Sequence, residues 1–189
     1  KLGSDTVTLT QAGAYSSADA GSGISITMND SISGTDAANY NLTQPTVTGT
    51  ISQKALGISA TATYSGSTTV TSPTATLTGL VSADSSATVS SIVINDKDVA
   101  DATYITSLVL SNGKQANYSL RGSANASLGT STTNTITLSK ATLTVTGTTA
   151  PSKEYDGTTT IATISGGSLS GKLGSDTVTL TQAGAYSSA

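Results

Sequence analysis

The first eighteen residues of the chain, 1–18, recur letter for letter at its end as residues 172–189. Two identical runs of this length do not arise by chance, so the sequence holds one full period of 171 residues and an overlap. A fixed period of this kind is typical of a repeat array, and it constrains the fold more than any other feature. We therefore interpret the chain as a slice of a longer tandem protein. A duplication confined to this chain would give the same overlap.

A second, weaker repeat divides this period into two related units, A and B. The matching blocks keep the same order in both: 54–56 with 140–143, 63–69 with 154–160, 77–79 with 169–171, 38–42 with 116–120, and 48–51 with 133–136. We predict three segments from this order. Residues 1–53 are the C-terminal part of A, residues 54–139 are a complete B of 86 residues, and residues 140–189 are the N-terminal part of the next A.

The local patterns within each unit indicate β-strands. Apolar and polar residues alternate with period two at residues 5–10, 23–28, 46–52 and 141–147, and longer apolar runs cover 87–95 and 103–111. No helical period extends beyond a turn or two, so the predicted class is all-β. Each unit has roughly seven to nine short strands, as expected of a small β-sandwich-like module, Ig-like or β-grasp-like. A parallel solenoid would need a period of roughly 20–30 residues, which the sequence lacks.

The connections between units are short. The chain passes through residues 51–56 and 138–143 from the last strand of one unit to the first strand of the next, with no Gly/Ser or Pro-rich spacer. Such links limit bending between neighbours. We therefore expect modules joined end to end in an extended, fairly stiff rod, in which adjacent repeats of the same chain are partners.

Composition excludes several functions. The net charge is −3 and the few Lys and Arg are scattered, which argues against nucleic acid and anionic membranes as partners. No apolar run is long enough for membrane insertion of this stretch. Cysteine is absent, so disulfides and thiolate metal sites are excluded. There is no His, and Glu154 is the single Glu, so we do not expect an enzyme or a catalytic residue.

The motif Tyr155-Asp156-Gly157, with its counterpart Tyr64-Ser65-Gly66, is the first candidate site. It fits a binding loop, but we favour a structural turn. Asp bonds the backbone two residues on, Gly supplies a positive φ, and Tyr packs its ring while its hydroxyl finds a backbone partner.

The pairs Asn39-Tyr40 and Asn117-Tyr118 receive the same structural interpretation. Their expected role is similar to that of the tyrosine corner in β-sandwiches, where a Tyr hydroxyl bonds the backbone nearby.

The densest acidic patch contains Asp96, Asp98 and Asp101. Carboxylates two or three residues apart in a loop supply some of the oxygen ligands of Ca²⁺, so calcium is the one cofactor that we consider. Lys97 lies in the middle of the patch, and no Asp-x-Asp-x-Asp-Gly run is present. We therefore favour a solvated turn and expect no cofactor.

The order of the motifs resembles the YDG-type repeat, and the related MBG-type repeat, of very large bacterial surface proteins and exoproteins, often haemagglutinin-like adhesins. Unit A carries the closer match, in the blocks 153–159, 169–171, 174–180, 19–23, 33–42 and 54–56. Unit B departs from it, because Tyr64-Ser65-Gly66 replaces Tyr-Asp-Gly. The resemblance implies a secreted, extracellular β-rich repeat of a bacterial cell-surface stalk or adhesin, and no particular ligand.

Two functions fit these observations. The first is a structural spacer that projects a distal functional domain from the cell. The second is a multivalent module in which each unit adds a weak contact to a glycan, to host or matrix surfaces, or to other copies of the fibre, as in adhesion and biofilms. Tyr15, Tyr104 and Tyr186 are the candidates for sugar stacking outside the motifs. We favour the spacer, because a resemblance does not by itself establish binding.

Overall fold

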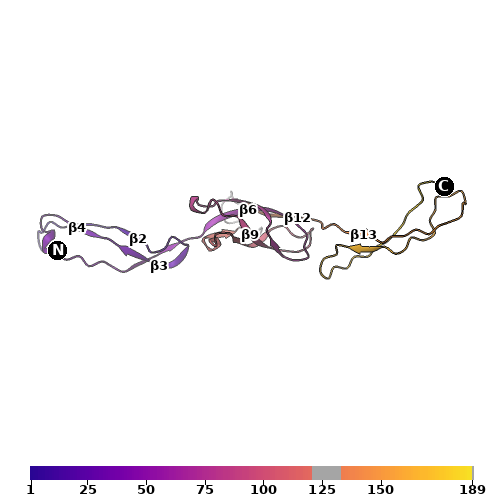
Figure 1. The fold of residues 1–189 in the computed structure, drawn as a ribbon. Helices are drawn as coiled ribbons and strands as arrows, with labels where there is room; N and C mark the ends of the chain where they lie inside the picture. The colour runs from indigo at the N-terminus through magenta and orange to yellow at the C-terminus, as the bar shows by residue number, and fades with distance from the viewer. Residues whose placement is uncertain (121–132, 189) are drawn as a thin grey trace.

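The computed structural model describes residues 1–120 and 133–188; residues 121–132 of the predicted unit B and Ala189 lie outside them. Across these residues the chain consists of short strands and three single 3₁₀ turns, so the predicted all-β class is confirmed. The ribbon is elongated, with the N-terminus at one end, β6 and β9 in the middle, and the C-terminus at the other end (Figure 1). No helix in the described ranges is long and apolar enough to cross a membrane.

Residues 54–139, the central segment, form two facing sheets. The elements are β6 (Lys54–Thr63), β7 (Thr69–Thr71), β8 (Thr74–Thr78), η2 (Ser82–Asp84), β9 (Val89–Ile94), β10 (Ile105–Leu110), η3 (Gln115–Asn117), β11 (Tyr118–Leu120) and β12 (Asn134–Ser139). In one sheet β6 is the middle strand, parallel to β11 and β12 on one side and antiparallel to β8 on the other. The second sheet has the order β10-β9-β7.

An apolar core fills the space between these two sheets. Its fully buried members are Leu56 and Ile58 of β6, Ile92 of β9, and Ile105 and Leu110 of β10. Burial of each such side chain is worth roughly 1.5–3 kcal/mol. All the buried hydrophobic residues of the described chain lie in this segment, so the segment has the layered arrangement of a β-sandwich.

Residues 1–53, the N-terminal segment, form two small sheets. They contain β1 (Thr8–Thr10), β2 (Gly13–Tyr15), β3 (Gly21–Met28), β4 (Ser31–Ser33), η1 (Ala37–Asn39) and β5 (Val47–Ile51), with β1 paired to β4 and the order β2-β3-β5. All residues of β1 and β2 are exposed. Asp30 is buried, and its carboxylate accepts a hydrogen bond from Ala12 N at 2.9 Å. The buried residue of this segment is therefore a hydrogen-bonded carboxylate, and none of its hydrophobic residues is fully buried.

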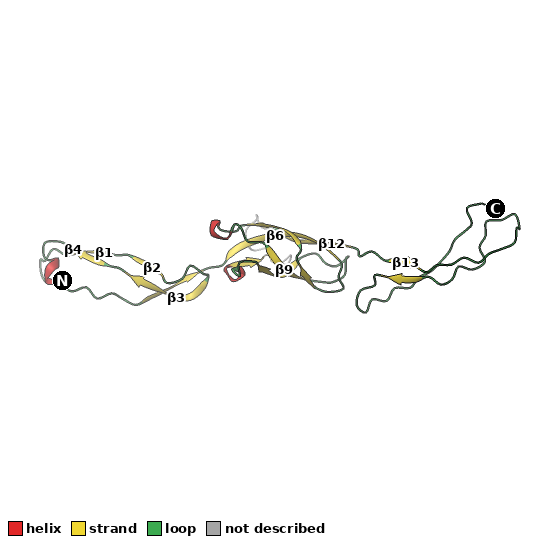
Figure 2. Ribbon diagram, in the orientation of Figure 1, coloured by secondary structure: helices red, strands yellow, loops and turns green. Residues whose placement is uncertain are grey.

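Residues 140–188, the C-terminal segment, are mostly loop, as Figure 2 shows. Their strands are β13 (Thr144–Thr146) and β14 (Ser168–Ser170), which pair antiparallel, and isolated bridges join Thr149 to Ser165 and Thr160 to Ala185. Residues 172–188 contain no strand, although the same letters at 1–17 contain β1 and β2. Residues 8–10 and 13–15 are extended strands because β4 and β3 pair with them.

Gly79 and Gly171 close equivalent strand pairs of the central and C-terminal segments. Their φ angles are +94° and +95°, a region that favours glycine. A Cβ at Gly79 would lie 2.7 Å from the carbonyl oxygen of Ala55, and one at Gly171 would lie 2.8 Å from that of Thr142. Both positions therefore favour glycine for the same two reasons, a positive φ and a carbonyl oxygen close to where a Cβ would lie.

Candidate functional site

The side-chain contacts that bridge the segments lie at two junctions, one at each end of the central segment. The N-terminal junction joins residues 19–20 and 53 to residues 114–117, and the C-terminal junction joins residues 64–66 and 99 to residues 140–143 and 171–178. These junctions are the candidate functional site, because they determine how consecutive segments are held together.

At the N-terminal junction, Asp19 is the central group. Its carboxylate accepts hydrogen bonds from Lys114 Nζ at 2.8 Å and from Asn117 Nδ2 at 2.7 Å. Asn117 Oδ1 accepts a bond from Ala20 N at 2.7 Å, and Gln53 Nε2 donates to the carbonyl of Ala116 at 2.9 Å. The bonds from Lys114 and then Asn117 lower the pKa of Asp19, and the same ion pair raises the pKa of Lys114. Both side chains of the pair are about half exposed, so solvent screens the ion pair and its contribution to stability is small.

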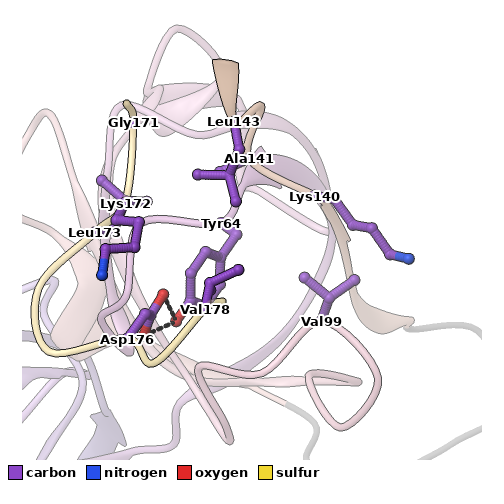
Figure 3. A pocket seen from close by; sticks show the side chains of 10 residues that line it. All are labelled: Tyr64, Val99, Lys140, Ala141, Leu143, Gly171, Lys172, Leu173, Asp176 and Val178. Atoms are coloured by element: carbon purple, nitrogen blue, oxygen red, sulfur yellow. Dashed lines mark hydrogen bonds between the residues drawn. The ribbon is translucent and has the colours of Figure 1, made fainter. Parts of the chain in front are cut away.

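At the C-terminal junction, Tyr64 is the central group. Its hydroxyl lies 2.9 Å from each carboxylate oxygen of Asp176, and Figure 3 shows the ring directed at that carboxylate. Gly66, with φ +74°, lies against Leu173; a Cβ on the glycine would be 3.6 Å from Leu173 Cβ. The hydrogen bond to Asp176 is the main cause of the raised pKa of Tyr64.

A cavity of about 200 Å³ opens beside this contact. Its apolar wall comes from both segments: Val99 from the central one, and Ala141, Leu143, Leu173 and Val178 from the C-terminal one (Figure 3). Lys140 and Lys172 line it as well. The packing between the central and C-terminal segments is therefore incomplete. The hydrogen bonds between Tyr64 and Asp176 link the two segments beside the cavity.

Tyr40 and Tyr118 each hold a turn within their own segment. The Tyr40 hydroxyl donates to Asp5 Oδ2 at 2.6 Å and accepts from Leu2 N at 2.7 Å. The Tyr118 hydroxyl donates to Asp84 Oδ2 at 2.6 Å and accepts from Val81 N at 3.2 Å. Burial is the main cause of the raised pKa of Tyr118, followed by the bond to Asp84. Each Tyr thus bonds a carboxylate as well as a backbone N–H, and that N–H lies 38 positions from Tyr40 and 37 from Tyr118 rather than nearby as in a tyrosine corner.

The two Asn residues that precede these tyrosines differ. Each ends a 3₁₀ turn, in which Asn39 N–H donates to the carbonyl of Asp36 at 3.1 Å and Asn117 N–H donates to that of Lys114 at 3.0 Å. The Asn117 side chain also bonds the N-terminal segment, as described above. The two Asn-Tyr pairs therefore share the hydrogen bonds of the tyrosine hydroxyl, and they differ in the side-chain contacts of the asparagine.

Sequence reasoning missed the acidic partners of these tyrosines. Asp5, Asp84 and Asp176 each follow an aliphatic residue by three positions, and in all three turns the Asp N–H donates to the carbonyl of that residue at 2.9–3.1 Å. This Leu/Val-x-x-Asp pattern was the signal available in the sequence. It becomes informative only when the three blocks are aligned with one another.

The Tyr155-Asp156-Gly157 motif forms a tight turn. Asp156 Oδ1 accepts hydrogen bonds from Thr158 N at 2.9 Å and Lys153 Nζ at 2.7 Å, and Gly157 has a φ of +72°. Lys153 is the main cause of a fall in the pKa of Asp156 to about 2, followed by Thr158.

The expectation that Tyr155 packs its ring is wrong, because 86% of the residue is exposed. Its counterpart Tyr64 is partly buried because the turn at residues 173–176 lies against it. The described residues place no such turn beside Tyr155.

The acidic patch consists of local turn contacts. Asp96 Oδ1 accepts from Asp98 N at 2.8 Å, Asp98 Oδ1 pairs with Lys97 Nζ at 2.7 Å, and the carbonyl of Asp101 accepts from Asn95 Nδ2. Across the described ranges no three His, Cys, Asp or Glu residues are grouped so that they could hold a metal ion. Calcium binding by Asp96, Asp98 and Asp101 stays an untested prediction.

The three tyrosines considered for sugar stacking are held by different contacts. Tyr15 lies across Gly49, where a Cβ would be 2.6 Å from the Tyr15 hydroxyl oxygen. The Tyr186 hydroxyl donates to the carbonyl of Pro151, and Lys153 Nζ lies 5.7 Å from the centroid of the Tyr186 ring. Tyr104 N donates to Asn95 Oδ1. These rings lie in different segments and do not form one surface.

Comparison with known proteins gives one match. The family model of the YDG domain matches residues 1–49 and 139–189, which together are more than half of the chain. Neither the curated proteins nor the solved structures contain a match to the chain. The matched ranges nearly coincide with residues 1–53 and 140–189, which the repeat assigned to unit A, and this agrees with the closer resemblance of that unit. The chain therefore belongs to the YDG domain family.

Proposed function

We propose that this chain is a structural spacer of a large extracellular bacterial adhesin or surface fibre. Its β units follow one another as an extended rod and project a distal functional domain from the cell. The observation that carries the proposal is the pair of junctions. Side-chain hydrogen bonds link each end of the central segment to the next segment, and only two residues separate β5 from β6. A short link and a bridging contact together restrict bending.

The secreted, cell-surface setting is part of the same proposal. Membership of the YDG family supports it, together with the resemblance of the motifs to those of large adhesins. A Ser/Thr-rich surface with few charges and no cysteine suits a long polypeptide that is exported before it folds.

The test varies the number of 171-residue periods between an anchor and a fixed tip domain. A spacer predicts that the maximum dimension in small-angle X-ray scattering grows by an equal step with each period, while binding per tip stays constant. Tip binding that falls when a single period is removed would contradict the spacer function.

A multivalent binding module is the second candidate, and the exposed Tyr155 favours it. Tyr155, Lys153, Asp156 and Tyr186 line an open cavity of about 410 Å³, and an exposed ring beside polar groups is suited to stacking on a sugar. A glycan array would test this candidate with the wild-type chain and the Tyr155→Ala variant, and Tyr104→Ala would be the matched control. Glycan binding that is lost with Tyr155→Ala and kept with Tyr104→Ala supports the binding module. If neither the wild-type chain nor either variant binds a glycan, this candidate function is excluded.

A further inference from the structure

We propose that Asn112 is a modification site. Its side-chain amide converts spontaneously to an acid, and this change weakens the contact that Lys114 makes at the N-terminal junction. Asn112 and Gly113 form the only Asn-Gly pair of the sequence. The inference goes beyond the spacer function and does not rest on it, because a rod can act as a spacer whether or not this residue changes.

The reaction needs only the two residues and water. The main-chain nitrogen of Gly113 loses its proton and bonds to Cγ of Asn112, and Nδ2 takes up a proton and leaves as ammonia. Water then opens the resulting succinimide ring at either carbonyl, which gives aspartate or isoaspartate. Glycine favours the ring closure because it has no Cβ to obstruct the attack. The net change is amide plus water to acid plus ammonia, with no oxidation or reduction.

The reacting atoms lie at an open position on the surface of the central segment. Asn112 and Gly113 are both exposed. Gly113 has a φ of +70°, and a Cβ built on it would have no atom within 4 Å. No neighbouring group therefore blocks the approach of the Gly113 nitrogen to the Asn112 side chain.

Two hydrogen bonds hold the Asn112 amide in one orientation. Lys114 N donates to Asn112 Oδ1 at 3.1 Å, and Asn112 Nδ2 donates to Asp84 Oδ1 at 2.9 Å. When Cγ is attacked, negative charge develops on Oδ1, and a backbone N–H directed at that oxygen stabilises the charge as in an oxyanion hole. The turn thus polarises the carbonyl that the reaction uses.

One hydrogen bond opposes the reaction. Gly113 N donates to the carbonyl of Leu110 at 3.0 Å, and this bond has to break before the nitrogen can reach Cγ. Opening of a short surface turn costs much less free energy than global unfolding. We therefore expect the reaction to proceed in the folded chain, at a rate that this local opening sets.

The product places a second carboxylate beside Asp84. Asp84 already accepts a hydrogen bond from the Tyr118 hydroxyl at 2.6 Å, and the bond that Asn112 donated to it is lost. Two neighbouring carboxylates repel each other when both are ionised. Isoaspartate also adds a methylene to the main chain at position 112. Both products therefore disturb the turn that leads into Lys114.

The disturbance reaches the N-terminal junction through Lys114. Lys114 Nζ lies 2.8 Å from Asp19 Oδ1, and this bond is the main cause of the raised pKa of Lys114, to which the charge of Asp84 adds. A new carboxylate two positions away competes with Asp19 for the same ammonium group. We expect the contact between the N-terminal and central segments to weaken as the chain ages.

Unit A lacks this site. Gly34-Thr35-Asp36 occupies the positions that align with Asn112-Gly113-Lys114. The modification therefore belongs to the central segment, and in a longer array it would recur once in each 171-residue period.

Peptide mapping of the aged chain tests the modification. Cleavage after Lys and Arg gives peptide 98–114, in which Asn112 is the single Asn, and peptide 115–121, in which Asn117 is the single Asn. Mass spectrometry should show conversion of Asn112 at least about tenfold faster than that of Asn117, because Tyr118 obstructs the attack and Gly113 does not. A chain digested without ageing gives the baseline. Equal rates at the two residues would overturn the inference.

Two variants test the effect on the junction. Asn112→Asp and Asn112→Ala both remove the bond to Asp84, but only Asn112→Asp adds a charge. The amide of Ala20 donates to Asn117 Oδ1 across the junction and reports the contact. At neutral pH it should exchange at least about twofold faster in Asn112→Asp than in the wild-type chain, and at the wild-type rate in Asn112→Ala.

Wild-type exchange of Ala20 in Asn112→Asp would overturn the link to the junction. Equally fast exchange in both variants would also overturn it, because the added charge would then not be the cause. Neither result bears on the spacer function, whose test is the length of covalent arrays.

Discussion

The central segment and the C-terminal segment contain equivalent strand pairs in different states. β6 and β8 belong to a closed two-sheet body in which Leu56 and Ile58 are fully buried. β13 and β14 have the same register, yet Leu143 and Val145 remain more than one-third exposed. The difference lies in the parallel strands β11 and β12, which only the central segment has beside its first strand. Without such strands beside it, β13 leaves the apolar side chains of its segment partly exposed.

The largest expected effect of a mutation distinguishes the two strands directly. Ile58→Ala should lower the free energy of unfolding by about 2–5 kcal/mol, because it leaves a cavity in a packed core. Val145→Ala, on the equivalent strand, should change the free energy of unfolding by less than about 0.5 kcal/mol, as surface substitutions do. Urea denaturation of the dilute chain measures both. Equal losses would show that the C-terminal segment is packed as well as the central one.

The next-largest effect is expected at Tyr118 and Tyr40, the two tyrosines whose hydroxyls bond groups within their own segment. Tyr118→Phe removes a bond from the buried Tyr118 to the partly buried Asp84 carboxylate and should destabilise the central segment by about 1–3 kcal/mol. Tyr40→Phe removes the corresponding bond to Asp5 in a more exposed site, so a smaller loss is expected. Amide exchange of Val81 and Leu2, which donate to the two hydroxyls, reports each contact. A larger effect at Leu2 would contradict the comparison.

A third prediction concerns the C-terminal junction. The bond to Asp176 raises the pKa of Tyr64 above the ordinary value of 10.0, so the contact favours the protonated phenol. The linkage therefore gives stabilisation that is fully present below pH 10 and is lost as the pH rises through the folded-state pKa.

NMR titration of Tyr64 tests this prediction, with Asp176→Asn as the variant. The pKa of Tyr64 should fall toward the ordinary value in the variant, because a neutral amide no longer opposes ionisation. The pKa of Tyr118, whose hydroxyl bonds Asp84 and not Asp176, serves as the control in the same spectra. An unchanged pKa of Tyr64 would exclude the contact across the junction.

The smallest effect is confined to the Tyr155-Asp156-Gly157 turn. The pKa of Asp156 is about 2 in the folded chain, below its ordinary value of 3.8. Its contribution is therefore present above pH 4 and is lost as the pH falls from about 4 to about 2. The amide shift of Thr158 should follow this titration, and Asp156→Asn should remove it. A midpoint near 3.8 would mean that Lys153 and Thr158 do not hold the carboxylate.

The features that depend on neighbouring residues could be predicted from the sequence. The period-two patterns predicted the all-β class, and β9 and β10 lie within the apolar runs at 87–95 and 103–111. The turn at Asp156 and Gly157 also follows from local chemistry, since an Asp oxygen bonds a backbone N–H two residues on. The repeat alignment was sufficient to recognise the YDG family.

The contacts between distant residues could not be predicted in this way. Tyr64 and Asp176 are 112 positions apart, and nothing near Tyr64 indicates that its partner lies in the next segment. The exposure of Val145 and Tyr155 could not be predicted for the same reason. Their local patterns match those of Ile58 and Tyr64, but burial depends on which strands and turns lie beside them.

Residue-resolved hydrogen exchange of residues 1–189 compares the first strands of the central and C-terminal segments directly. We expect the slowest amides to lie in β6, β9 and β10 and to exchange through one cooperative opening, whereas the amides of β13 and β14 should exchange by local opening at a much faster rate. Equal protection of β6 and β13 would instead mean that β13 is packed as firmly as β6 without parallel strands beside it.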